Sequence, residues 1–256
     1  MELKDKIIVV TGAASGIGRA MALRFIREGA RFVACADLNA DGAAATASAA
    51  GQAARPFRCD VSKEEDIRNL IDTVEREAGP IDLFCSNAGI GIGGGVEATN
   101  QAWQRIWDIN LMAHVWAARH LIPRMVARGG GYLLNTASAA GLLSQIGSAP
   151  YAVTKHAAVG LAEWLSITHG DQGIKVSVLC PQAVRTAMTA GNEDGVASID
   201  GMIEPEAVAE VVVEGLAAEQ FLILPHPEVL DYMRRKTADY GRWIGGMRKL
   251  NRRFHS

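Results

Sequence analysis

The chain has 256 residues, of which 49% are hydrophobic and 21% are charged, and its formal net charge at pH 7 is -2. This length suits one α/β domain whose core is large enough to fold without disulfide or metal staples. The near-neutral balance excludes an electrostatic footprint for nucleic acid or an anionic membrane, and no apolar run is long enough to span a bilayer. The N-terminal residues MELKDKIIVVTG lack the apolar region of a signal peptide, so we expect a soluble, cytoplasmic protein.

Short β-rich runs alternate with helical patterns along the whole chain. The runs predict strands at residues 6–12, 31–37, 56–60, 81–89, 131–138, 174–181 and 221–225. Helical periodicity predicts helices at about 16–29, 62–78, 100–128, 149–171 and 205–219, and the Ala-rich residues 40–54 predict a short one. Ser62 and Glu65 form a possible capping box at the second long helix.

Continuous apolar strands that alternate with helices are typical of a parallel sheet with helices on both faces. We therefore predict a single α/β domain over residues 1–256, a Rossmann-type doubly wound sheet of about seven strands.

Two segments interrupt the alternation. Residues 182–204 are rich in Gly, Ala, Thr and Asp and follow a strand, which is where a lid over the ligand lies in this kind of fold. Residues 228–256 carry many more basic than acidic side chains. This basic extension predicts a solvated helix or a subunit contact, with recognition of an anionic substrate as the alternative.

The cysteines and histidines give no sign of a metal site. The four cysteines lie in or at the ends of apolar runs without any CxxC pair, so we expect buried free thiols at Cys35, Cys59, Cys85 and Cys180. The histidines form no HxH or HxxxH pair. We predict no bound metal.

The residues TGAASGIG at 11–18 follow the first strand and open the first helix. Gly12 permits a tight turn, Gly16 lets the backbone approach a pyrophosphate, and Gly18 allows the helix to pack closely on the strand. The free N–H groups and the positive dipole end of the helix then face the phosphates. This segment predicts a dinucleotide site.

Asp37 ends the second strand, 19 residues after Gly18. A carboxylate there accepts hydrogen bonds from the adenosine ribose hydroxyls and repels a 2′-phosphate. Neither Ala14 nor Leu38 offers a compensating base. We therefore predict NAD rather than NADP as the cofactor, and the alternative for Asp37 is an ordinary turn acid.

Tyr151 and Lys155 lie four residues apart on one helix face, and Ser138 ends the preceding strand. A phenol titrates near ~10, and a neighbouring ammonium favours its ionised form. A working pKa of roughly 7–8 for Tyr151 needs ~3–4 kcal/mol from Lys155 and the nicotinamide charge. Such a phenol takes the proton from a secondary alcohol while the hydride leaves for the nicotinamide ring, and Ser138 can hold the same oxygen.

Together these motifs resemble the short-chain dehydrogenase/reductase family. The resemblance covers residues 5–225 and rests on motifs in the family's order: TGAASGIG at 11–18, Asp60-Val61, SNAG at 86–89, Asn110, Ser138 and YAVTK at 151–155. Joint occurrence is far more specific than any one motif. The chain departs from the family where Gln182 follows Pro181 in place of glycine. Gln cannot readily adopt a positive φ, so the backbone is expected to differ there, and the amide can reach the substrate.

The resemblance implies roles for the matching residues. Tyr151 is expected to be the acid/base, Lys155 to lower its pKa and bind the nicotinamide ribose, and Ser138 to orient the carbonyl. Asn110 is expected to hold a water that connects Lys155 to solvent. The adenine, the adenosine ribose, the phosphates and the carboxamide are expected to contact Gly12, Ser15, Gly16, Ile17, Gly18, Asp37, Leu38, Asp60, Val61, Asn87, Ala88, Gly89, Pro181, Val184 and Thr186.

The leading prediction is an NAD-dependent oxidoreductase that interconverts a secondary alcohol and a ketone. Apolar residues expected near the site favour an apolar or aromatic substrate: Ile92, Leu142, Leu143, Ile146, Val184 and Met188. Two alternatives stay open, a reductase of an anionic or carrier-linked 3-oxoacyl thioester and a catalytically silent NAD-binding protein. The resemblance also implies a homotetramer built through the helices at 100–128 and 149–171 and the last strand, with apolar area from Trp103, Trp107, Trp116 and Trp164.

Overall fold

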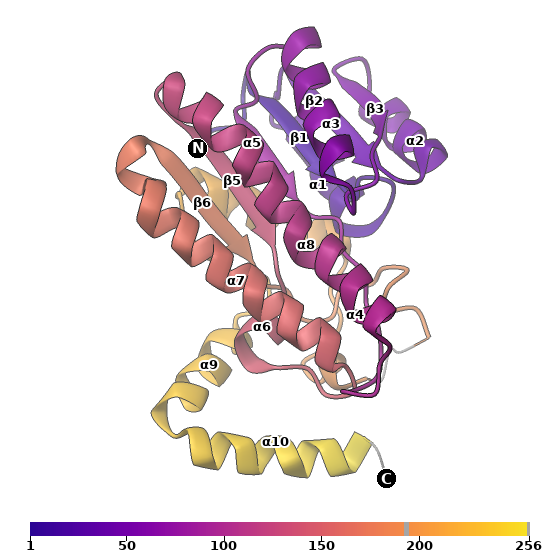
Figure 1. Cartoon of the computed structure of the whole chain (residues 1–256), viewed down its shortest axis with the longest axis vertical. Helices are drawn as coiled ribbons and strands as arrows, with labels where there is room; N and C mark the ends of the chain where they lie inside the picture. Colours follow the sequence, from indigo (N-terminus) through magenta and orange to yellow (C-terminus); the bar gives the residue numbers. More distant parts are fainter. Residues whose placement is uncertain (192–194, 255–256) are drawn as a thin grey trace.

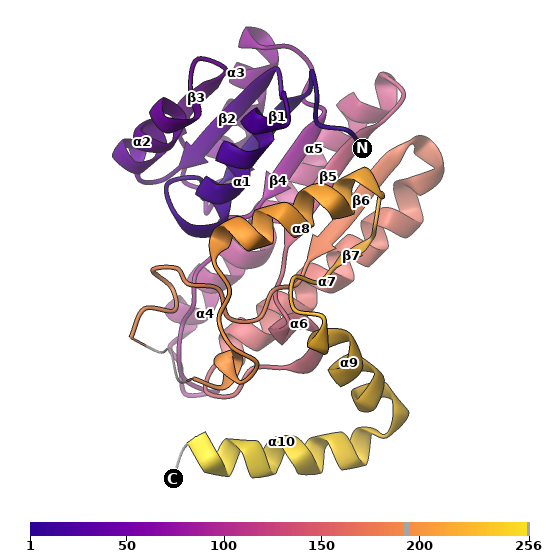
Figure 2. The same cartoon turned by 180° about the vertical axis from the view of Figure 1, so that it is seen from behind.

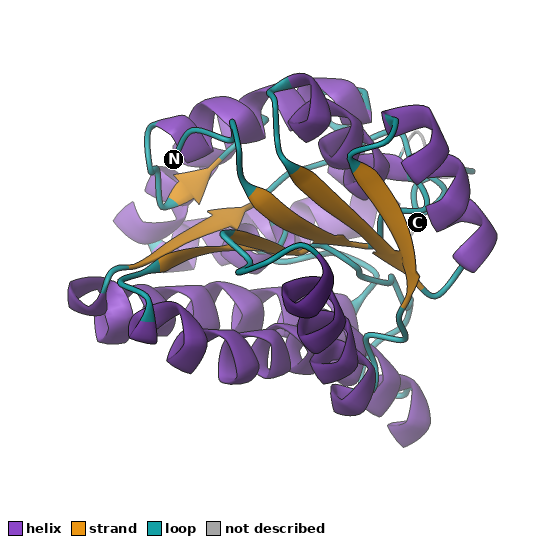
Figure 3. Cartoon of the chain, turned by 90° about the horizontal axis from the view of Figure 1, so that it is seen from above, coloured by secondary structure: helices purple, strands orange, loops and turns teal. Residues whose placement is uncertain are grey.

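The computed structural model describes residues 1–191 and 195–254, which form a seven-stranded sheet with helices on both faces (Figure 3). All strand pairs are parallel, in the order β3-β2-β1-β4-β5-β6-β7. The predicted doubly wound fold is confirmed. The strands are β1 (Ile7–Thr11), β2 (Phe32–Asp37), β3 (Ala54–Arg58), β4 (Leu83–Ser86), β5 (Gly131–Thr136), β6 (Ile174–Leu179) and β7 (Leu222–Ile223).

The helices fall into two layers and a C-terminal pair. In the part of the chain that the structure describes, they are α1 (Gly16–Arg27), α2 (Ala40–Ala50), α3 (Glu64–Glu77), α4 (Asn100–Trp107), α5 (Ala113–Ala127), α6 (Ala140–Leu143), α7 (Ala149–His169), α8 (Pro205–Ala217), α9 (Glu228–Ala238) and α10 (Tyr240–Phe254). One apolar core joins the sheet to α3, α5 and α7 (Figure 1), and another joins it to α1 and α8 on the opposite face (Figure 2).

All strands except β2 end earlier than the sequence predicts. β4 ends at Ser86 and β5 at Thr136, because the following residues turn over the edge of the sheet instead of continuing the ladder. Backbone N–H groups after β4 donate to the side chain of Thr11. Because β4 and β5 end there, Asn87 of the SNAG motif and Ser138 follow the strands at the carboxyl edge of the sheet.

The expected capping box does not form. Helix α3 begins at Glu64 after Lys63, and Ser62 donates a 2.6 Å hydrogen bond from Oγ to Asp60 Oδ1. Glu65 pairs with Arg68 in the next turn of the same helix. The helix starts one residue later than the capping box requires, with Lys63 as the N-cap, so Ser62 lies outside the capping position.

The predicted extension at 228–256 folds as two helices up to Phe254, and residues 255–256 lie outside the described part of the chain. Val229 in α9 is fully buried and packs with Ala139 and Leu143 near α6. Helix α10 then runs beyond the body of the molecule (Figures 1 and 2). None of the helices in the described ranges has the length and apolar character needed to cross a membrane.

The four cysteines are buried free thiols, as predicted. Burial raises the pKa of Cys35, Cys59 and Cys180 to about 12. They are therefore protonated core residues at neutral pH.

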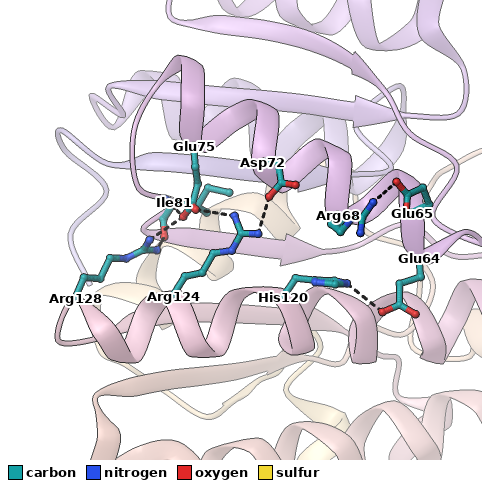
Figure 4. A network of polar contacts seen from close by, with 9 residues as sticks. All are labelled: Glu64, Glu65, Arg68, Asp72, Glu75, Ile81, His120, Arg124 and Arg128. Atoms are coloured by element: carbon teal, nitrogen blue, oxygen red, sulfur yellow. Dashed lines mark hydrogen bonds and ion pairs between the residues drawn. The ribbon is translucent and has the colours of Figure 1, made fainter.

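A network of ion pairs joins α3 to α5 (Figure 4). Glu75 accepts hydrogen bonds from Arg128 at 2.7 Å and from Arg124 at 3.0 Å, and Arg124 also contacts Asp72 at 2.6 Å. Burial raises the pKa of the Glu75 carboxyl, but the hydrogen bonds from the two arginines outweigh burial, and the pKa lies below its ordinary value of 4.5. The network therefore stabilises the fold while Glu75 is ionised.

The variant Glu75→Gln is expected to lower the free energy of unfolding at pH 7 by about 1–2 kcal/mol, because hydrogen bonds to a charged group are lost. Since the folded-state pKa of Glu75 is depressed, this stabilisation is present above pH 4.5 and is lost as the pH falls through the folded-state value. Urea denaturation across this range measures it. The exposed Glu65→Gln is the matched control, and an equal cost for Glu75→Gln at acidic and neutral pH would contradict the assignment.

Candidate active site

A cleft of about 1730 Å³ lies where the loops leave the carboxyl edge of the sheet. With one exception, every residue predicted to contact cofactor or substrate oxygen lines it: Gly12, Ser15, Gly16, Ile17, Gly18, Asp37, Leu38, Asp60, Val61, Asn87, Ala88, Gly89, Ser138, Tyr151, Lys155, Pro181, Val184 and Thr186. The exception is Asn110, which is fully buried behind the cleft wall. The fold therefore brings motif residues that lie between positions 12 and 186 of the chain into one cleft.

The glycine loop leaves no room for side chains. Gly12 has a φ of +67°, and a Cβ atom there would lie 2.9 Å from Ala88 Cα. A Cβ on Gly18 would lie only 2.1 Å from the carbonyl oxygen of Gly12. Ser15 is the N-cap of α1, yet its side chain makes no capping hydrogen bond. The loop is thus a bare backbone cradle at a helix N-terminus, which fits a pyrophosphate.

Asp37 faces this cradle from the end of β2. Its Oδ2 accepts the N–H of Ala14 at 2.9 Å, and its Oδ1 accepts the N–H of Asn39 at 2.9 Å. An ionised carboxylate has about four acceptor sites, so about two remain for a ligand, and Asp37 lines the cleft. The neighbouring Leu38 is 55% exposed in the same wall.

The next wall of the cleft comes from Asp60 and Val61. The pKa of the Asp60 carboxyl is lowered, first by the hydrogen bond from Ser62, although burial opposes this. Val61 is buried and presents an apolar surface. This pair follows β3, as the sequence predicts.

Hydrogen bonds connect the glycine loop to the lysine of the YAVTK motif. Thr11 Oγ1 accepts the N–H groups of Asn87 and Ala88, and the carbonyl oxygen of Thr11 accepts the side-chain N–H of Asn87 at 3.0 Å. Asn87 Oδ1 accepts the hydroxyl of Thr136, whose carbonyl oxygen accepts Lys155 Nζ at 3.0 Å. Asn87 therefore ties three strand ends together while it lines the cleft.

Lys155 is 3% exposed and makes no ion pair with a carboxylate of the described residues. Burial lowers the pKa of its ammonium from 10.5 to about 8. Its Nζ lies 5.7 Å from the centre of the Tyr151 ring. The site thus holds a buried charge beside the phenol without neutralising it.

The pKa of Tyr151 lies above its ordinary value of 10.0, because burial of the phenol outweighs its hydrogen bond with Ser138. The chain by itself therefore does not produce the lowered pKa expected from the sequence. Ser138 is held by the N–H of Ala140, which donates to its Oγ at 3.1 Å, and its hydroxyl also faces the carbonyl oxygen of Pro181. These two contacts, with Ala140 and Pro181, hold the hydroxyl of Ser138 beside the phenol of Tyr151.

Asn110 lies in a π-helical turn, Asp108–Met112, between α4 and α5. Its Oδ1 accepts the N–H of Ile90 at 2.9 Å, and its Nδ2 donates to the carbonyl oxygen of Ile90 at 3.0 Å. A Cβ on Gly89 would lie 3.3 Å from Asn110 Oδ1 and 3.5 Å from Lys155 Nζ. Asn110 therefore fixes the loop after β4 next to Lys155, and such π-turns are frequent at functional sites.

Gln182, the departure from the family pattern, has a backbone outside the left-handed region. Its N–H donates to His226 Nδ1 at 3.2 Å, and its Nε2 donates to Asp200 at 3.1 Å. Tyr232 in α9 donates to the same carboxylate at 2.8 Å. The carboxylate of Asp200 therefore connects Gln182, at the start of the predicted lid, to Tyr232 in the C-terminal extension. Residues 192–194 of that lid lie outside the described part of the chain.

The other lid contacts lie where predicted. Val184 is buried, and Thr186 faces the glycine loop, since a Cβ on Gly16 would lie 2.9 Å from its Cγ2. Ile92, Ile146 and Met188 also line the cleft. Leu142 was expected among these residues but packs instead on the hydrophobic core.

Four large apolar residues of the cleft come from α10 and are absent from the sequence prediction: Trp243, Met247, Leu250 and Phe254. Their spacing of four, three and four residues places them on one side of the helix and is the signal that could have found them. The basic residues around them dominate the composition of the extension.

In residues 1–191 and 195–254, no group of three or more His, Cys, Asp or Glu side chains is placed to hold a metal ion.

Comparison with known proteins gives consistent matches. The sequence profile of the family described as short chain dehydrogenase matches residues 6–197. The chain is 32% identical over 236 residues to epidermal retinol dehydrogenase 2 of Homo sapiens, covering 89% of this chain and 76% of that protein. It is 34% identical over 252 residues to 1-deoxy-11-beta-hydroxypentalenate dehydrogenase of Streptomyces exfoliatus, covering 95% and 91%. A short chain dehydrogenase/reductase from Burkholderia phymatum, crystallised with NAD, matches with a TM-score of 0.85 at 29% identity, over 94% of this chain and 96% of that one.

Replacing Lys155 by Met is expected to stabilise the fold at pH 7 while it damages the site. The lowered pKa of Lys155 corresponds to a cost of about 3 kcal/mol for the buried ammonium, partly offset by about 1 kcal/mol from its bond to Thr136. Below pH 8 both folded and unfolded chains carry this proton, so the full cost is present. It declines as the pH rises from about 8 towards 10.5.

Urea denaturation of the cofactor-free protein at several pH values measures this effect. We expect Lys155→Met to be more stable than the parent by about 2 kcal/mol at neutral pH, with the gain shrinking in alkali. Lys175→Met removes an exposed lysine paired with Glu219 and serves as the matched control. A Lys155→Met protein that is less stable at every pH would contradict the assignment.

Proposed function

The chain belongs to the short-chain dehydrogenase family, and on that premise we propose that it is an NAD-dependent oxidoreductase that interconverts a secondary alcohol and a ketone. The observation that carries the proposal is the position of Ser138, Tyr151 and Lys155 in the same cleft as the glycine loop. The names of the two relatives, a retinol dehydrogenase and a hydroxypentalenate dehydrogenase, support an alcohol as the substrate.

In the oxidative direction, Ser138 Oγ and the phenolate oxygen of Tyr151 hold the substrate hydroxyl, and the phenolate accepts its proton as the carbinol C–H bond breaks. A nicotinamide cofactor held in this cleft would supply the hydride acceptor and, in its oxidised form, a positive charge. That charge acts with the ammonium of Lys155 to favour the phenolate, which burial alone opposes. Asn110 supports this step by fixing Ile90 beside Lys155, and its proposed further role is to hold a water that connects Lys155 to solvent as a proton relay.

The carboxylate of Asp37 supports NAD over NADP. Its two available acceptor sites suit the 2′- and 3′-hydroxyls of the adenosine ribose, whereas a 2′-phosphate would place like charges together. The bonds from Ala14 and Asn39 hold the carboxylate in this position.

The proposal includes the remaining expectations from the sequence. Residues 1–256 act as one domain, 182–204 as a substrate lid, and the protein is a cytoplasmic homotetramer. Exposed apolar side chains on α7 support a subunit contact, because Trp164 is 56% and Ile167 is 84% exposed.

A second candidate is the reduction of an anionic or carrier-linked 3-oxoacyl thioester. It is favoured by Arg235 and Arg242, which line the cleft from the C-terminal extension. A catalytically silent NAD-binding protein is the third possibility, and it has no comparable observation in its favour.

The test is the absorbance of the reduced cofactor during incubation with NAD⁺ or NADP⁺ and a panel of secondary alcohols and 3-hydroxyacyl thioesters. We expect turnover with NAD⁺ and simple alcohols, and a loss of at least about 100-fold in Tyr151→Phe because the acid/base is removed. NADH affinity should change little, because the reduced nicotinamide carries no positive charge to couple with the phenol. Tyr240→Phe removes a hydroxyl from an exposed tyrosine and is the matched control.

Three other results would each contradict part of the proposal. Preference for NADP⁺ would overturn the role of Asp37. Turnover of thioesters alone would favour the second candidate. Tight NADH binding with no turnover of any substrate would favour the silent binding protein.

A further inference from the structure

Helix α10 presents an apolar stripe to the cleft. Trp243, Met247, Leu250 and Phe254 follow one another by four, three and four residues and therefore share one side of the helix. All four line the same cleft as Ser138 and Tyr151. The stripe and the catalytic residues thus border one continuous space.

Most of this stripe has no protein core to pack against. None of the residues of α10 is buried, and the neighbour that it contacts most is α9. Trp243 touches the small apolar cluster around Val229, whereas Met247, Leu250 and Phe254 are half-buried at the cleft. An amphipathic helix gains its stability by covering its apolar face, so this face calls for an apolar occupant.

The other sides of α10 are mainly basic, although the apolar Ile244 is also exposed there. Arg248, Lys249 and Arg252 are exposed, and Tyr240–Phe254 contains no acidic residue. The helix therefore has two faces: an apolar inner face that lines the cleft and a basic outer face that is exposed to solvent.

The base of α10 is held in place by α9. Lys236 Nζ donates to the carbonyl oxygen of Leu142 at 2.5 Å, and Tyr232 binds Asp200 of the lid segment. Asp239 then accepts the N–H of Arg242 at 2.9 Å at the start of α10. Helix α9 is therefore anchored both to α6 and to the lid segment, and it fixes the place where α10 begins.

We propose that the inner face of α10 is a binding subsite for the apolar body of a large alcohol substrate whose hydroxyl lies at Tyr151 and Ser138. The inference rests on the proposed function and names the class of substrate for that site. The cleft volume of about 1730 Å³ exceeds the ~300–1,000 Å³ of ordinary small-ligand pockets, so the space suits a dinucleotide together with a bulky hydrocarbon skeleton.

Continuity with the catalytic residues is what selects substrate over other occupants. A lipid surface or a second copy of the chain would cover the stripe from outside and would not need the stripe to border Tyr151. These two occupants are outcomes of the test below.

The experiment compares two triple variants in a series of secondary alcohols of increasing apolar size, from 2-propanol through 2-octanol to a hydroxysteroid, at saturating NAD⁺. Met247→Ser, Leu250→Ser and Phe254→Ser together remove the inner stripe. Arg248→Ser, Lys249→Ser and Arg252→Ser together change the outer face with the same number of serines.

For the parent protein we expect kcat/KM to rise with the size of the alcohol. The inner-face variant should lose about tenfold or more of kcat/KM for the hydroxysteroid, mainly through KM, because apolar contact area is lost. Its kcat/KM for 2-propanol and its NAD⁺ affinity should stay within about twofold, and the outer-face variant should match the parent. If the inner-face triple variant does not fold, Leu250→Ser against Lys249→Ser gives the same comparison with smaller effects.

Several outcomes would overturn the subsite. A parent protein with no preference for large alcohols would do so, as would an inner-face variant that loses small and large alcohols equally. Unchanged kinetics with loss of the native oligomer in light scattering would assign the stripe to a second copy. Unchanged kinetics with loss of sedimentation on phosphatidylcholine–phosphatidylglycerol vesicles would assign it to a lipid surface. If the parent protein turned over none of the alcohols, the proposed function would be overturned, and the subsite with it.

Discussion

The site depends on a chain of hydrogen bonds that runs from Thr11 through Asn87 and Thr136 to Lys155. Because each bond ends on a backbone or side-chain group at the end of a central strand, the glycine loop and the lysine cannot move independently. The last bond of this series joins the ammonium of Lys155 to the carbonyl oxygen of Thr136 and not to a carboxylate. Its positive charge is therefore held in the cleft and stays available to the phenol, at the cost of a buried ammonium in the core.

Burial acts on both titrating groups in the direction of their neutral forms. It lowers the pKa of Lys155 to about 8 and raises that of Tyr151 above 10.0. The resting site is therefore poor at abstracting a proton, and a second positive charge is needed before the phenolate becomes accessible. In the proposed reaction this links the acid/base step to occupancy of the dinucleotide cradle, so that neither half of the cleft works alone.

The sequence predicts those parts of the structure that local chemistry determines. Gly12 and Gly18 could be assigned because only glycine fits their close approaches, and Asp37 because it closes an apolar strand at a recognisable distance from them. Features that depend on distant partners could not be predicted. The partner of Gln182 is Asp200, 18 residues further along, and the inner face of α10 is defined by a cleft made from the rest of the chain. The capping box failed because α3 begins one residue later than expected, with Lys63 as its N-cap.

The most direct test of the account is whether NAD⁺ binding releases a proton from Tyr151. Calorimetric titrations at pH 8 in buffers with different ionisation enthalpies measure the number of protons released. The account predicts more release on binding NAD⁺ than NADH, because the positive charge of the oxidised nicotinamide lowers the pKa of the phenol. The difference should be smaller in Tyr151→Phe, where only Lys155, with a pKa of about 8, still loses protons to that charge. Equal release by the parent and Tyr151→Phe, or equal release with both cofactor forms, would contradict it.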